Sequence, residues 1–242
     1  MKKQHHSAAI LVIGNEILSG RTHEKNAHLA AQKFFECGCR LGEILVVPDI
    51  ESRIVEGIKR LISCYGAVIT SGGIGPTHDD ITMQSVAKAF DVELAEHQGV
   101  IGVMQDAYGQ EMLNSGRRRM ARVPRGSKLI RCEKSIAPGV RLDNVYVLAG
   151  VPDIFASQLE TILPNFGDQP FLRREIEVSL PESLFASELS QLQQQFPEVE
   201  IGSYPSRCGK RATGKICLSS KVEEHLDAAR LAVKKIIANL QE

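Results

Sequence analysis

The sequence lacks a net charge and any long apolar run, and both absences limit the functions open to it. Lysine and arginine together number 29, as do aspartate and glutamate, so the formal net charge is zero. A neutral chain has no global field that attracts nucleic acid or an anionic membrane, and we expect neither as a partner. No apolar run approaches the roughly 20 residues of a membrane span, and no small-residue cleavage site follows the first apolar stretch. We therefore expect a cytoplasmic protein whose charge-based recognition is local.

Several common site signatures are also missing. The six cysteines have the paired spacing of neither a zinc site nor a disulfide framework, and the close pair Cys37 and Cys39 is weak evidence for a metal. No Gly-Lys-Ser/Thr follows a glycine turn, and no G-x-G-x-x-G follows the first predicted strand. A Walker loop and a nicotinamide site are therefore unsupported, and we interpret the cysteines as thiols in a reducing cytosol.

Short apolar strands alternate with helices along most of the chain. We predict strands over 8–13, 40–49, 67–71 and 144–150, and helices over 24–38, 51–66, 80–91, 97–114 and 151–166. This alternation indicates βαβ units around a parallel sheet, so the predicted fold class is α/β. Residues 115–143 break the pattern with proline and glycine.

A second, smaller domain is expected after the sequence "GDQP" at 167–170, which is typical of a linker. Beyond it the pattern reads strand, helix, strand, strand, helix. This order predicts a small α+β (βαββα) domain with helices on one face of an antiparallel sheet. The domains are therefore expected to span 1–167 and 168–242.

Glycines and acids follow the predicted strands. Because ligands bind outside the carboxyl ends of the strands in an open parallel sheet, these residues are candidates for one site. The candidates are Gly14, Asn15 and Glu16 after the first strand, Asp49 after the second, Ser71, Gly72, Gly73, Gly75, Pro76, Thr77, Asp79 and Asp80 after the third, and Gly150 and Pro152 after the strand that ends near 149.

The turn "SGGIGPTHDD" at 71–80 combines groups that attract anions with groups that repel them. Its glycines can expose backbone N–H groups, and the helix expected to begin near Asp80 adds its positive end. A phosphate beside two carboxylates would be repelled unless a divalent cation lay between them. We therefore predict a divalent metal, Mg²⁺, Mn²⁺ or Co²⁺, held by Asp49 and Asp80 with Asp79 or Glu16. The alternative is helix capping, by Asp79 or Asp80 for one helix and by Asp49 for another.

A local basic cluster stands out in this neutral chain. Arginines occupy positions 117, 118, 119, 122 and 125. They could hold a phosphate or a nucleotide, but charge runs are usually solvated, and we favour a solvated face for all except Arg122.

The motifs resemble a known family. The stretch from Gly72 to Thr82 is similar to the signature of the molybdopterin-binding MoaB/MogA family, and its double aspartate is closer to the amino-terminal domain of CinA and the related domain of eukaryotic FAD synthases. The blocks "GNEILSG", "MARVPRGSKLI", "APG" and "AGVP" are similar to further blocks of that subgroup and occur in the expected order. The resemblance covers about residues 1–165.

The resemblance implies a three-layer α/β/α domain with a mostly parallel sheet that often forms a dimer or trimer and binds a pterin phosphate or a nucleotide diphosphate. It also implies that Asp49 and Asp80 are the catalytic acidic pair and that Gly72, Gly73, Gly75 and Thr77 form the phosphate-binding turn. The leading hypothesis is metal-dependent hydrolysis of a diphosphate such as ADP-ribose or FAD. The alternatives are a molybdopterin-binding protein or transferase in cofactor assembly, and a non-catalytic regulatory module.

Two positions depart from the subgroup's pattern. Asn15 stands where CinA-type domains usually have aspartate, and "IRCEKSIAPG" lacks the usual Asn-x-x-Gly. The sequence contains no CinA-type amidase domain, so we do not expect deamidation of nicotinamide nucleotides.

Overall fold

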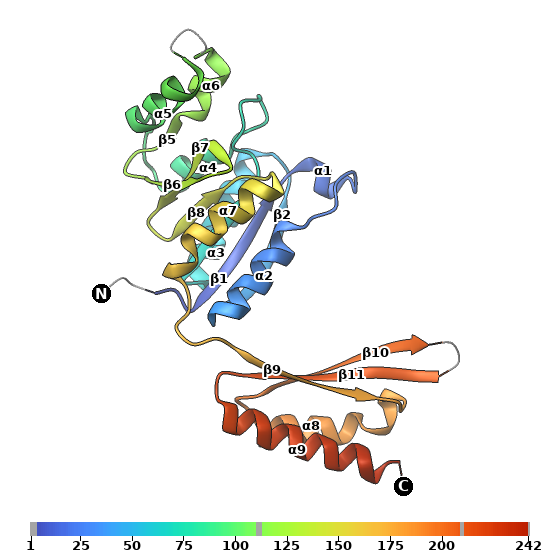
Figure 1. Ribbon diagram of the computed structural model, residues 1–242. Helices are drawn as coiled ribbons and strands as arrows, with labels where there is room; N and C mark the ends of the chain where they lie inside the picture. The colour runs from blue at the N-terminus through green and yellow to red at the C-terminus, as the bar shows by residue number, and fades with distance from the viewer. Residues whose placement is uncertain (1–3, 110–112, 209–210, 242) are drawn as a thin grey trace. The chain divides into compact units, whose positions relative to one another are not determined.

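The computed structural model describes residues 4–109, 113–208 and 211–241, which form two compact units, Met1–Asp168 and Gln169–Glu242. The first unit contains a six-stranded sheet in the order β2-β1-β3-β8-β7-β6 (Figure 1). The strands are β1 (Ser7–Ile13), β2 (Arg40–Val47), β3 (Ala67–Ser71), β6 (Lys128–Cys132), β7 (Ser135–Leu142) and β8 (Val145–Leu148). The strands β2, β1, β3 and β8 run parallel, whereas β7 and β6 are antiparallel additions at one edge.

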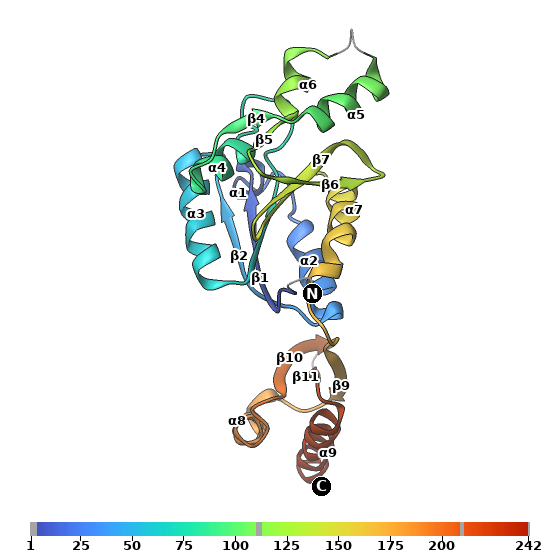
Figure 2. The same cartoon turned by 90° about the vertical axis from the view of Figure 1, so that its left-hand side faces the viewer.

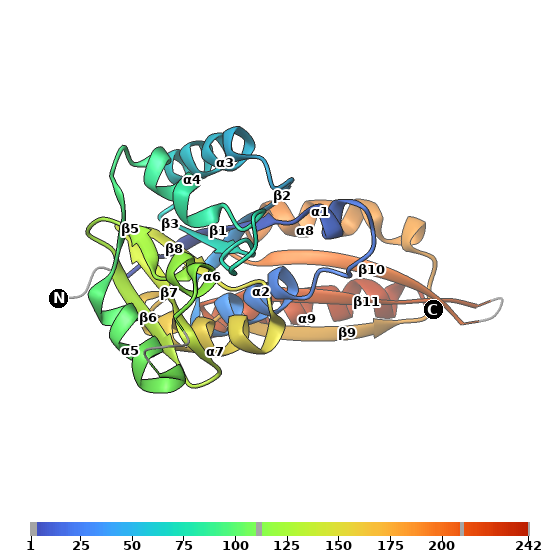
Figure 3. The same cartoon turned by 90° about the horizontal axis from the view of Figure 1, so that it is seen from above.

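Helices cover both faces of this sheet, which confirms the predicted three-layer α/β/α fold with a mostly parallel sheet. The helices α2 (Asn26–Cys37) and α7 (Pro152–Ile162) pack on one face, through Phe34 and Phe155 among others. The helices α3 (Glu51–Cys64) and α4 (Thr82–Ala89) pack together on the other face, through Ile58 and Val86 (Figures 2 and 3). The central strands β1, β3 and β8 are buried almost throughout, because both of their faces lie under helices.

The region after α4 differs from the prediction. Of the helix expected over 97–114, the described residues contain α5 (Gln98–Tyr108), which ends before Gly109 in a positive-φ conformation, and residues 110–112 lie outside the described residues. Further along the chain come α6 (Ser115–Met120), β5 (Arg122–Pro124), β6 and β7, where the sequence indicated an irregular segment. The proline and glycine residues of this segment do not indicate regular structure. These short elements form because tertiary pairing stabilises them more than local propensity does.

The elements β4 (Leu94–Glu96), α5, α6 and β5 form what we call the arginine lobe. Its strands β4 and β5 pair antiparallel, and its helices share a small core of Val100, Ile101, Met104 and Ala121. In Figure 1 this lobe lies above the carboxyl end of the main sheet. Leu129, Ile136 and Ala137 of β6 and β7 pack against this core, so the lobe is held on the main sheet and presents its outer residues as one wall.

The second unit has the predicted βαββα order. Its strands β9 (Leu172–Val178), β10 (Glu200–Cys208) and β11 (Arg211–Ser220) form an antiparallel sheet in the order β10-β11-β9. The helices α8 (Ala186–Gln195) and α9 (Glu223–Asn239) bury Leu192, Leu226 and Val233 in one core with Ile216. Alternate residues of β9 are exposed, as expected for a sheet covered on one face.

No helix within the described parts of the chain is long and apolar enough to cross a membrane.

Candidate functional site

The parallel strands bring the predicted site residues to one edge of the main sheet. The neighbours β2, β1, β3 and β8 end beside one another, and the loops that follow them are hydrogen-bonded across strands. The Gly14 amide donates to the Val47 carbonyl at 3.2 Å, and the Gly72 amide donates to the Leu148 carbonyl at 3.3 Å. The candidate site is therefore assembled from residues far apart in the sequence.

The turn after β3 has a backbone path that only glycine follows without strain. Gly72 has φ of 104° and Gly73 has φ of 67°, and a Cβ atom on Gly72 would lie 2.3 Å from the Ile13 carbonyl oxygen. Buried Thr82 fixes this path, because its hydroxyl donates to the Gly72 carbonyl at 2.8 Å and its amide donates to the Gly73 carbonyl at 3.0 Å. Gly150 packs directly against the same turn, since a Cβ atom there would lie 3.1 Å from the Gly72 Cα.

The two adjacent aspartates converge on one threonine hydroxyl. Thr77 Oγ1 lies 2.6 Å from Asp79 Oδ1 and 2.5 Å from Asp80 Oδ2, and the Thr77 amide also donates to Asp80 Oδ2 at 2.8 Å. A hydroxyl carries a single proton, so it cannot donate fully to both carboxylates. The hydrogen bond from Thr77, supported by the Asp79 backbone amide, holds the pKa of Asp79 below its usual value. The pair is therefore a local concentration of negative charge.

The capping interpretation is wrong for these acids. The helix α4 begins at Thr82 after Ile81, and α3 begins at Glu51 after Ile50, and neither N-terminus has a side-chain cap. Asp49 instead accepts a hydrogen bond from the Asn15 backbone amide, with an Asn15 N to Asp49 Oδ2 distance of 2.7 Å. This link uses the main chain of residue 15, so it does not depend on whether asparagine or aspartate stands there.

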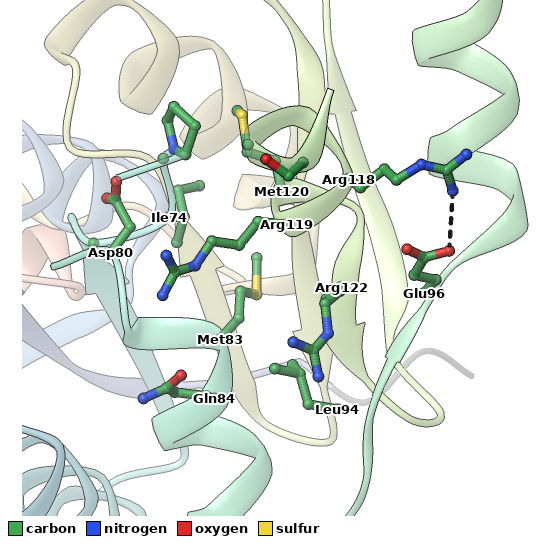
Figure 4. A pocket seen from close by; sticks show the side chains of 15 residues that line it. Ile74, Asp80, Met83, Gln84, Leu94, Glu96, Arg118, Arg119, Met120 and Arg122 are labelled. Atoms are coloured by element: carbon green, nitrogen blue, oxygen red, sulfur yellow. Dashed lines mark ion pairs between the residues drawn. The ribbon is translucent and has the colours of Figure 1, made fainter. Parts of the chain in front are cut away.

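A cavity of about 520 Å³ separates the glycine turn from the arginine lobe, and we call it the arginine pocket (Figure 4). One side is formed by Gly73, Gly75, Pro76 and half-buried Asp80 together with Met83 of α4. The other side carries the residues of the lobe, which are Leu94, Glu96, Ser115, Gly116, Arg118, Arg119, Met120 and Arg122. Its size is that of a typical small-molecule site.

The arginines agree with the sequence interpretation in part. Arg118 and Arg119 are exposed, as expected for a solvated face, but they line the pocket together with Arg122, the one arginine that we had set apart. The Arg118 guanidinium lies 3.6 Å from Glu96, whereas Arg117 stacks on the Tyr108 ring and Arg125 pairs with Glu93. The sequence signal for this wall of the pocket was the arginine cluster. The position of the arginine side chains depends on the fold of the lobe, which the sequence did not predict.

A second, smaller cavity of about 80 Å³ lies on the other side of the glycine turn. It is lined by Glu16, Ser71, Gly72, Gly150 and Pro152, among others. Buried Asn26 belongs to it as well, and its amide group donates to Ser71 Oγ at 2.9 Å and to the Gly150 carbonyl at 2.8 Å. Asn26 thus ties the ends of β3 and β8 together, a role that we did not assign from the sequence.

The predicted metal ligands are divided among different surroundings. Asp80 lines the arginine pocket, Glu16 lines the smaller cavity, and Asp49 contacts the loop after β1. Across the described residues, no group of three or more His, Cys, Asp or Glu side chains could hold a metal ion. Any cation at this edge would therefore take part of its coordination from water or from a bound molecule.

The fold and this edge define a class of protein, a three-layer α/β/α domain with a glycine-rich turn at the carboxyl end of a parallel sheet. The family model described as "Probable molybdopterin binding domain" matches residues 9–174, and the model described as "FAD synthase, middle domain" matches residues 170–240. The chain belongs to the molybdopterin-binding-domain family, which confirms the resemblance seen in its motifs.

Individual relatives agree with this membership. A protein of Archaeoglobus fulgidus is 32% identical over 196 residues, which are 81% of this chain and 84% of that protein. The probable FAD synthase of Caenorhabditis briggsae is 30% identical over 97% of this chain, which spans only 50% of that relative. The CinA protein of Thermoplasma acidophilum, whose function is unknown, is 29% identical to this chain, and its crystal structure matches with a TM-score of 0.62 over 65% of this chain and 95% of the CinA chain.

Proposed function

We propose that this protein hydrolyses a nucleotide diphosphate of the ADP-ribose or FAD type, with a divalent metal ion, at the glycine turn. The observation that supports this most strongly is the arginine pocket, which places Asp80 and the glycine turn opposite arginine side chains. Glycine amides and guanidinium groups bind phosphate oxygens, and a carboxylate beside them is suited to a cation or a water molecule. The similarity to FAD synthases supports a nucleotide as the ligand.

The acidic residues fit a metal that arrives with its substrate. Mg²⁺ is commonly bound by one or two carboxylates together with substrate phosphates and water, so it does not need a cage of protein ligands. Asp79 and Asp80 share one hydroxyl proton between two carboxylates, and a cation beside them would relieve their repulsion. A bound divalent cation would neutralise phosphate charge and lower the pKa of a water molecule.

Groups of the protein would orient the diphosphate and the attacking water and would accept a proton. The amides of Gly73 and Gly75 would orient the diphosphate, and Asp80 would accept the proton of the attacking water. The water oxygen forms a bond to one phosphorus atom while the bond from that phosphorus to the bridging oxygen breaks, and two phosphate monoesters leave. Asp49, held by the Asn15 amide, would help to position the cation or the water.

The test is a panel of diphosphates incubated with Mg²⁺, Mn²⁺ or Co²⁺. We expect AMP release from ADP-ribose or FAD, and we expect Asp80→Asn to lower turnover by at least about a hundredfold, the low end of a general-base contribution. Unchanged turnover in Asp80→Asn would remove Asp80 from the mechanism. Absence of AMP release across the panel would contradict the hydrolase.

A second candidate is a protein that binds molybdopterin without hydrolysis or transfers a group to it. The description of the matching family model favours it. Binding of a pterin phosphate with no AMP release from any diphosphate would select this candidate.

A further inference from the structure

We propose that Arg119 is a specificity-determining residue that binds the second phosphate of the ligand, so that the site selects a nucleoside diphosphate over the corresponding monophosphate. This inference rests on the proposed site for a phosphorylated nucleotide, and it concerns recognition instead of hydrolysis. It assigns a binding role to Arg119, for which the sequence alone favoured a solvated face.

The first step is that, among the described residues, the Arg119 guanidinium forms no hydrogen bond and no ion pair. Three arginines of the lobe line the arginine pocket, but Arg118 already pairs with Glu96. Among the described residues, Arg119 and Arg122 form no hydrogen bond and no ion pair with another side chain. A guanidinium group presents N–H donors in a planar fork that matches two phosphate oxygens, so an unpaired one at a cavity wall is suited to an anion.

The second step is the direction of the two unpaired side chains. In Figure 4, Arg119 extends toward the side of the pocket that holds Asp80 and Met83, whereas Arg122 lies beside Leu94. Arg119 therefore faces the glycine turn across the cavity. If the glycine amides bind one phosphate of a diphosphate, the second phosphate points toward the opposite wall of the pocket, where Arg119 lies.

The third step is the balance of charge in the pocket. Asp80 and Glu96 contribute negative charges to its lining, and Arg118, Arg119 and Arg122 contribute positive ones. Glu96 offsets Arg118, and Asp80 repels any phosphate that approaches without a cation. A second phosphate therefore gains attraction mainly where a guanidinium is unpaired, and Arg119 is the one that extends toward Asp80.

The remaining lining explains why the rest of the ligand adds little discrimination between the two nucleotides. Ile74, Met83, Leu94 and Met120 give the pocket apolar surface suited to a flat ring. Such a ring is the same in a nucleoside diphosphate and in its monophosphate. Preference between the two must therefore come from charged groups.

The experiment compares ADP with AMP, which differ by one phosphate, by calorimetry at fixed ionic strength and with the same Mg²⁺ concentration. We expect the wild-type protein to bind ADP more tightly than AMP. Arg119→Gln should reduce this preference about tenfold, because a hydrogen bond to a charged group contributes on that scale, while AMP affinity changes by less than about twofold. Arg119→Lys keeps the charge without the fork and should retain part of the preference.

Arg125→Gln is the matched control, because it removes the same charge from an arginine that pairs with Glu93 outside the pocket lining. Its ADP and AMP affinities should both match the wild type. The inference is overturned if Arg119→Gln keeps the full preference, if Arg125→Gln loses as much, or if the wild-type protein binds both nucleotides equally or binds neither. Loss of AMP release from every diphosphate, with the ADP preference intact, would contradict the hydrolase and leave the role of Arg119 standing.

Discussion

Thr82 offers the sharpest test of how the glycine turn is held, and the substitution Thr82→Val isolates one hydrogen bond. Valine has nearly the shape of threonine, so the change removes the hydroxyl that donates to the Gly72 carbonyl at 2.8 Å. Thr82 is fully buried, and the valine methyl would leave that carbonyl facing an apolar group. An unsatisfied buried acceptor costs about 1–3 kcal/mol, and we expect the free energy of unfolding to fall by that amount.

The assay is differential scanning calorimetry of the full chain. For a unit of the size of Met1–Asp168, 1 kcal/mol corresponds to a shift of about 2–4 °C in Tm, so the expected decrease is about 2–12 °C. Because the chain contains two compact units, the relevant transition is the one that Ile58→Ala in the first unit also lowers and Ile216→Ala in the second does not.

Thr82→Ser is the matched control, since it keeps the hydroxyl and removes only a methyl group. We expect it to cost about 1 kcal/mol and to retain ADP affinity, whereas Thr82→Val should weaken ADP binding as well, because the amides of the turn lose their fixed direction. The reasoning is refuted if Thr82→Val unfolds within about 0.5 kcal/mol of the wild type, or if Thr82→Ser and Thr82→Val weaken ADP binding equally.

Other positions give independent tests. Thr77→Val should raise the pKa of Asp79 toward its usual value, because the hydrogen bond that favours the carboxylate is lost; an unchanged pKa in metal-free NMR titrations would contradict this. The native Asp79 interaction should therefore stabilise the fold above the ordinary aspartate pKa and lose that effect as the pH falls through the lowered value. Gly150→Ala should lower Tm and ADP affinity together, since its Cβ atom would lie 3.1 Å from the Gly72 Cα; loss of neither would show that the two backbones can separate freely. Gly38→Ala, at φ of 79° after α2, should cost about 1 kcal/mol without any effect on ADP affinity, which urea denaturation and calorimetry can check.

The parallel core was predictable from the sequence because its signal is local. The run that ends at Ile13 is apolar throughout, and in the structure its residues from Ala8 onward are buried between two helical layers. Gly38 was predicted to end a helix, and it does so in the left-handed region. At such positions, apolar composition, hydrophobic periodicity and capping residues all occur within a few residues of one another. Each strand or helix end can therefore be predicted from its own stretch of sequence.

The arginine lobe was not predictable in the same way, because its elements depend on partners distant in sequence. The strand β5 is only Arg122–Pro124 and exists because it pairs with Leu94–Glu96 across the intervening helices. Without knowledge of that pairing, the sequence does not show which way the arginine side chains point, and a solvated face is the ordinary interpretation of a charge run. The contacts of Asp49 were hidden for a similar reason, since its partner is a backbone amide in a different loop.

The candidate site has two parts, the glycine turn and the arginine lobe, and only the turn could be predicted from local sequence. The turn that would bind phosphate is specified within a few residues, by glycines that alone accept its backbone path and by Thr82, which holds it. The wall that would select among phosphates is the lobe, whose small core adjoins the main sheet through Leu129, while Val123 of β5 belongs to a core of the main sheet. Because the Arg119 side chain is exposed on this wall, its substitution should change ligand preference at little cost to stability. Arg119→Gln should therefore leave Tm within about 2 °C of the wild type, as expected for an exposed substitution, and a larger loss would mean that the Arg119 side chain is needed for stability as well as for recognition.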